Sequence, residues 1–216
     1  KWLCGESKYH NDNPCLRKNP MKGVLVEFNS DFSRNIATNQ EICDLLRLAN
    51  SKEYNFSAGR WAFLFFSGMR PYEADRFWDP KLKLGWKSIN LIDKQPYIYI
   101  DKRVIQKKGL PARKIKIRKG FLEMLKAFKA EGEERYPMRV KNWRRIYSGV
   151  RKKIFGDRLS ISRDKDEAKD ITRHTFLSNL YLYEKNIAVV TGESGDNEST
   201  LKKHYINPLL CEGDAK

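Results

Sequence analysis

The chain has 216 residues, enough for one domain with a sizeable core and an appended arm. Its 43 Lys and Arg residues outnumber 27 Asp and Glu residues, and the formal charge of +16 is typical of proteins that bind nucleic acids. Neither a bilayer-spanning protein nor a disulfide-stapled secreted domain is expected, because no apolar run approaches roughly 20 residues and the four cysteines are scattered.

Residues 1–37 are predicted to form an N-terminal arm or linker, because they are polar and interrupted by proline and glycine. Residues 23–28 could form one short strand within this arm. Three potential metal ligands, Cys4, His10 and Cys15, also lie here, but no fourth ligand stands nearby. We therefore expect no metal site.

The predicted domain begins at Thr38, where residues 38–41 fit a capping box and apolar residues then recur with a helical period. A second helix is predicted over about residues 57–69, and its aromatic run at 61–66 indicates burial. After Gly85 the apolar period changes to two, which predicts strands. The three predicted strands cover residues 86–91, 97–100 and 113–118.

Helical patterns return near residue 120 and account for most of the remaining chain. The predicted helices cover about residues 120–131, 141–154, 168–184 and 197–206. Between the second and third strands, residues 102–111 are expected to form a basic loop. The predicted fold class is α+β, mainly helical with a small three-stranded antiparallel sheet.

Residues in widely separated segments have the chemistry needed to break and remake a phosphodiester through a covalent intermediate. Arg70 and Arg173 could bind the non-bridging phosphate oxygens, where negative charge grows in the transition state. The phenol of Tyr205 could attack phosphorus and later leave again. Lys108 in the basic loop could protonate the departing 5′ oxygen, with Lys107 as a rival for that role.

The order and spacing of these residues resemble the tyrosine recombinase family, which includes phage integrases and Xer-type chromosome resolvases. Residues 68–73, Gly-Met-Arg-Pro-Tyr-Glu, resemble the family's first-arginine motif, and Lys108 stands five residues before Arg113, as the family lysine commonly does. Residues 170–174 resemble the His-x-x-Arg motif. The pair at 195–196, with a tyrosine nine residues later, resembles the family's Gly-His element and its nucleophile.

Two residues depart from the family pattern. Asp170 stands where the family usually has His, and Asp196 stands where it usually has His or Trp. An ionised carboxylate accepts hydrogen bonds but cannot donate one to a phosphate. Three explanations remain open: Asp170 is a general base for the Tyr205 proton, one carboxyl is protonated, or His174 or His204 has taken over.

The resemblance implies a catalytic domain over residues 38–208, followed by a C-terminal tail at 209–216. It also implies strand cleavage through a 3′-phosphotyrosyl intermediate, with double-stranded DNA as partner, a DNA-dependent homo-tetramer, and no metal or nucleotide cofactor. The setting would be DNA recombination or integration, in a cytoplasmic, nucleoid-associated and intracellular protein without a membrane partner.

Further residues are expected to support this site. Glu73 would orient Arg70. Basic side chains that could contact the DNA backbone are Lys107, Arg113, Arg144, Arg145, Arg151 and Lys152. Two alternatives remain: a DNA-binding protein that kept the fold with weakened or lost cleavage, and a nicking and religating enzyme like the type IB topoisomerases.

Overall fold

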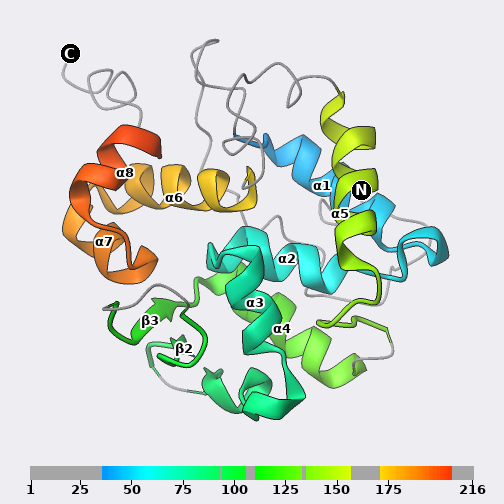
Figure 1. Ribbon diagram of the computed structural model, residues 1–216, viewed down its shortest axis with the longest axis horizontal. Helices are drawn as coiled ribbons and strands as arrows, with labels where there is room; N and C mark the ends of the chain where they lie inside the picture. Colours follow the sequence, from blue (N-terminus) through cyan, green and yellow to red (C-terminus); the bar gives the residue numbers. More distant parts are fainter. Residues whose placement is uncertain (1–35, 93, 106–109, 133–134, 157–170, 206–216) are drawn as a thin grey trace.

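The computed structural model describes residues 36–92, 94–105, 110–132, 135–156 and 171–205 (Figure 1). Its helices are α1 (Asn39–Ala49), α2 (Ala58–Ser67), α3 (Pro71–Phe77), α4 (Lys119–Glu131), α5 (Trp143–Phe155), α6 (Ile171–Glu184), α7 (Ile187–Ser194) and α8 (Glu198–His204). Its strands are β1 (Ile89–Asn90), β2 (Tyr97–Ile100) and β3 (Arg113–Lys116). Short 3-10 helices cover Lys52–Tyr54, Pro80–Leu82 and Gly85–Ser88. In these ranges no helix has both the length and the apolar character that crossing a membrane requires.

The three strands form one antiparallel sheet in the order β1, β2, β3. Ile98 lies opposite Ile115 in the register, and both side chains are buried, whereas Lys114 between the inward positions of β3 is exposed. This alternation is the period of two that the sequence shows. The predicted mainly helical α+β fold with a small antiparallel sheet is therefore confirmed.

The first strand is shorter than predicted. Residues 86–88, expected to open it, belong instead to the 3-10 helix that begins at Gly85, whose φ of 59° lies in the left-handed region. The Trp86 ring packs edge-on against Trp78, with ring centroids 5.3 Å apart. Tertiary packing of this indole, and not strand pairing, explains the apolar character at that position.

Helix α2 forms the centre of the core, and all ten of its residues are buried. Trp61 stacks on Tyr147 of α5 with ring centroids 4.8 Å apart, and Phe63 meets Trp78 edge-on at 5.2 Å. Such aromatic pairs contribute roughly 0.5–1.5 kcal/mol beyond the burial of their area. Because α2 also packs against α1 and α6, as Figure 1 shows, its ends are rigidly placed. The predicted buried helix is confirmed.

A tight turn joins α2 to α3. Gly68 ends α2 with a φ of 61°, and a Cβ added there would lie 2.1 Å from the Phe176 ring of α6. Arg70 then caps α3, where Pro71 occupies the first helical position and the Glu73 carboxylate accepts the Arg70 backbone N–H at 3.1 Å. Close contact between this turn and α6 thus determines the position of Arg70 at the start of α3.

Two helices, α3 and α7, were not predicted. In α7 the residues Ile187, Val189 and Val190 are β-branched, which by local preference favours a strand. The Asn186 side chain caps the helix by accepting the Ala188 N–H at 2.9 Å, and α7 packs against β3. The cap and the packing outweigh the local preference.

Substitution Gly68→Ala is expected to lower the free energy of unfolding by about 2–5 kcal/mol, because the left-handed backbone and the Phe176 ring both oppose a Cβ. Gly192→Ala is the control, since nothing lies within 4 Å of a Cβ there and Gly192 is inside α7. That change is expected to be neutral or to stabilise by up to about 1 kcal/mol. Urea unfolding of both variants makes the comparison, and equal stabilities would contradict the assigned turn.

Candidate active site

Arg173 of α6 is fully buried and connects three segments. Its Nη1 donates to the Gly68 carbonyl at 2.5 Å, at the end of α2, and its Nη2 donates to the Ser194 carbonyl at 2.9 Å, at the end of α7. The same Nη2 lies 2.6 Å from the Asp196 carboxylate. Arg173 is therefore held rigidly beside the turn that carries Arg70.

Asp196 bridges the two arginines. One carboxylate oxygen pairs with Arg173 and the other with Nη2 of Arg70, and the Asp196 side chain is only 6% exposed. Burial alone would raise the pKa of Asp196, but the charges and hydrogen bonds of the two arginines outweigh it and hold the pKa below its ordinary value. Asp196 is therefore ionised at neutral pH, which argues against a protonated carboxyl at this position.

Glu73 is the second buried carboxylate. It pairs with Nη2 of Arg113 at 2.7 Å, and it contacts Arg70 through both the backbone N–H and Nη1, the latter at 3.4 Å. Burial would raise the pKa of Glu73, but the charge and hydrogen bond of Arg113, helped by Arg173 and the Arg70 N–H, lower it. Glu73 thus contacts Arg70 at two points, and its role in orienting Arg70 stays a prediction.

Arg113 has a different place from the one expected. Its side chain is 4% exposed, its Nη2 pairs with Glu73, and its Nε donates to the Glu193 carbonyl at 3.1 Å. A guanidinium buried this way does not face solvent, so the structure corrects the expected contact between Arg113 and the DNA backbone. Arg113 instead neutralises the charge of Glu73, the carboxylate that also contacts Arg70.

The charges of this cluster nearly balance. Arg70, Arg113 and Arg173 bring three positive charges against two negative charges on Glu73 and Asp196, which leaves a net charge of +1 among these described residues. The excess cation still favours an anion at the outer edge, where Arg70 remains 20% exposed.

Tyr205 packs beside Arg173. It is the residue that ends α8, and its backbone carbonyl accepts from the Ser178 hydroxyl of α6 at 2.6 Å. Its ring centroid lies 5.8 Å from Cζ of Arg173 and 4.6 Å from the His174 ring. Arg173, which is joined to Arg70 through Asp196, therefore lies beside the predicted nucleophile, although Arg70 is more than 100 residues from both in the sequence.

Another phenol was missed by the sequence prediction. Tyr72 is half-buried in the first turn of α3. Burial and the Glu73 charge raise the pKa of the Tyr72 phenol, although Arg70 and the other two arginines of the cluster act in the opposite direction. The feature of the sequence that could have identified Tyr72 is its position two residues after Arg70. A raised pKa makes this phenol a poorer nucleophile near neutral pH.

Helix α5 carries four of the cations expected to contact DNA. Arg144, Arg145 and Lys152 are exposed, while Arg151 is half-buried with its guanidinium 5.2 Å from the Tyr147 ring centroid. Arg144 and Arg145 stand in the first turn, where the helix dipole disfavours cations and no acidic residue is present. Helix stability therefore does not explain their placement.

Several expected site residues lie outside the described residues. These are Lys107, Lys108 and Asp170, and the side chain of His204 is also not described. The predicted acid and the predicted base are thus not placed relative to Tyr205. Among the described residues, no group of His, Cys, Asp and Glu could hold a metal ion.

Comparison of the chain with protein-family models, curated proteins and solved structures finds no match. The function is therefore inferred from the arrangement of Arg70, Arg173, Asp196 and Tyr205 in this chain.

Asp196→Asn is expected to destabilise the fold by about 3 kcal/mol, because it leaves two arginines without their buried counter-charge. The folded-state pKa of Asp196 lies below its unfolded value of about 3.9. Its contribution is therefore present above that value and is lost as the pH falls through the folded-state pKa. Urea unfolding from pH 7 down to pH 3 should show the two proteins converging in acid.

The Asn variant should also gain a response to inorganic phosphate, because the arginine pair is then free to bind an anion. Thermal unfolding at constant ionic strength measures this response. Phosphate at a concentration of ten times its dissociation constant would stabilise the variant by about 1.4 kcal/mol. Glu193→Gln is the matched control, since Glu193 pairs with Arg118 at 2.7 Å outside the cluster. An equal phosphate response in all three proteins would contradict an anion site at this pair.

Proposed function

We propose that this chain cleaves and rejoins DNA strands through a 3′-phosphotyrosyl intermediate, as the resemblance to tyrosine recombinases implies. The observation that carries the proposal is the placement of Arg173, which is joined to Arg70 through Asp196 and has its buried guanidinium 5.8 Å from the Tyr205 ring. The positive charge of the chain and the exposed cations of α5 support a DNA partner.

In the proposed reaction, the Tyr205 oxygen attacks the scissile phosphorus while Arg70 and Arg173 bind its non-bridging oxygens. The bond from phosphorus to the 5′ oxygen breaks, and a proton from Lys108 completes the free 5′ hydroxyl. The tyrosyl proton passes to a base, for which Asp170 is the candidate. A 5′ hydroxyl of another strand then attacks the phosphotyrosine and releases the phenol, so no external energy source is needed.

Asp196 must leave the arginine pair before a phosphate can bind there. Its two oxygens occupy the donors that two phosphate oxygens would use. A phosphate about 4 Å from this carboxylate would be repelled by about 4 kcal/mol at an effective dielectric of 20, comparable to the benefit of one good oxyanion donor. The bridge therefore supports the second candidate, a DNA-binding protein with this fold and weakened cleavage.

The test of cleavage uses nicked duplexes of randomised sequence, in which loss of the short product traps a covalent adduct. We expect a protein-DNA adduct that resists denaturation and is absent with Tyr205→Phe. Tyr183→Phe is the control, because Tyr183 lies 65% exposed on the same α6 helix that supports the site. Loss of the adduct in Tyr72→Phe but not in Tyr205→Phe would contradict Tyr205 as the nucleophile and indicate Tyr72 of α3 instead.

Failure to trap an adduct with the wild type and with Asp196→Asn, while duplex DNA is still bound, would favour the DNA-binding protein over the enzyme. Relaxation of supercoiled plasmid that carries no defined site would instead favour the third hypothesis, a nicking and religating enzyme like the type IB topoisomerases. The recombinase hypothesis requires that the formation of rejoined strands depend on a second duplex and on a DNA-dependent homo-tetramer.

A further inference from the structure

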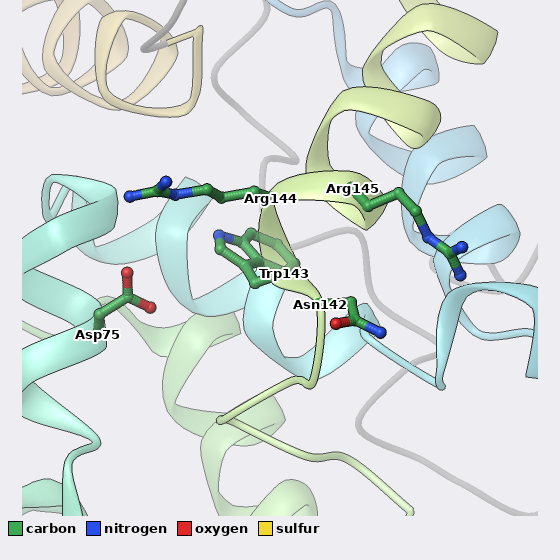
Figure 2. A pocket seen from close by; sticks show the side chains of 5 residues that line it. All are labelled: Asp75, Asn142, Trp143, Arg144 and Arg145. Carbon is green, nitrogen blue, oxygen red and sulfur yellow. The ribbon is translucent and has the colours of Figure 1, made fainter.

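A hollow of about 490 Å³ lies between α3 and the beginning of α5, outside the arginine cluster. It is lined by Asp75, Asn142, Trp143, Arg144 and Arg145 (Figure 2). Pockets for small molecules usually measure roughly 300–1,000 Å³, whereas one water accounts for only about 30 Å³. The hollow therefore has room for a nucleotide-sized group.

The lining favours an anion. Asp75 is the only carboxylate among the lining residues, and it already pairs with Arg60, whose side chain is 1% exposed beneath the surface. Arg144 and Arg145 are exposed and bring two positive charges that this pair does not neutralise. Their guanidinium groups bind phosphate oxygens with paired N–H donors.

Trp143 lines the hollow and is packed on two sides. Cζ of Arg60 lies 5.1 Å from the Trp143 ring centroid, and the Trp61 ring centroid lies 5.2 Å from it. Figure 2 shows the Arg144 side chain on one side of the indole and the Arg145 side chain on the other, pointing away from each other. Two separated cations across a fixed apolar ring suit an extended chain of phosphates better than one small anion.

Helix α3 connects the hollow to the arginine pair. Asp75 follows Arg70 by five residues, which corresponds to a rise of about 7.5 Å and a turn of about 140° beyond one full turn of a helix. The hollow and the arginine pair therefore lie on different faces of α3, and the hollow is a separate place for an anion.

We propose that this hollow binds the backbone of a DNA strand, with Arg144 and Arg145 each contacting one phosphate on either side of Trp143. The choice of DNA as the ligand rests on the proposed function, whereas the binding of a chain of phosphates does not. The Trp143 ring provides the apolar surface on which the intervening sugar packs.

The test uses the full chain carrying Tyr205→Phe, so that binding is measured without cleavage. Anisotropy of a labelled duplex gives the dependence of affinity on salt, and each lost phosphate contact lowers the slope by about 0.9. We expect Arg144→Gln with Arg145→Gln to lower it by about 1.8. The indole N–H resonance of ¹⁵N-labelled Trp143, assigned with Trp143→Phe, should shift on addition of DNA and should not shift in the double variant.

The matched control is Lys126→Gln with Lys129→Gln, which removes two exposed charges from α4 at positions that do not line the hollow. It should leave the response of the Trp143 resonance to DNA intact. A resonance that shifts equally in the arginine double variant, or that responds to inorganic phosphate as it does to DNA, would overturn the proposal. The salt dependence of affinity and the Trp143 resonance both report equilibrium binding. They can therefore support or contradict binding in the hollow even if no Tyr205 adduct forms.

Discussion

The structure around the candidate site depends on one constraint: the guanidinium of Arg173 is buried and must have counter-charge and acceptors. Asp196 supplies the charge, and the carbonyls of Gly68 and Ser194 supply the remaining acceptors. An unpaired ion in the interior costs several kcal/mol. The ends of α2 and α7 are therefore held at one distance from α6, and the same carboxylate also holds Arg70.

This constraint links stability to function. A carboxylate between two arginines resembles, in charge and in acceptor geometry, the phosphate that the resemblance predicts for the same place. The bridge stabilises the folded chain, and under the proposed function it would compete with a DNA phosphate for the same donors. Weak cleavage and firm backbone binding would then be compatible in one protein, with a balance that depends on how easily Asp196 is displaced.

Much of the fold could be predicted from local patterns. The capping box at Thr38, the apolar run of α2 and the alternation in β2 and β3 are local signals, and the structure contains the corresponding elements. The helices α3 and α7 were not predicted because their apolar patterns are short and, in α7, β-branched. Packing against β3 decides the latter, and a single sequence window does not contain that contact.

For the site, the residue order by itself indicated Arg70, Lys108, Arg173 and Tyr205 as a set, because phosphoryl transfer needs those chemical types, and Asp196 entered only as a departure from the family pattern. Only the tertiary structure decided what the described members of the site contact. Asp196 ties the two arginines together, and Arg113 turns inward to Glu73 and away from solvent. The physical reason is that charge pairing depends on distances of a few ångströms between residues that lie 23, 40 and 126 positions apart, which no spacing along the chain determines.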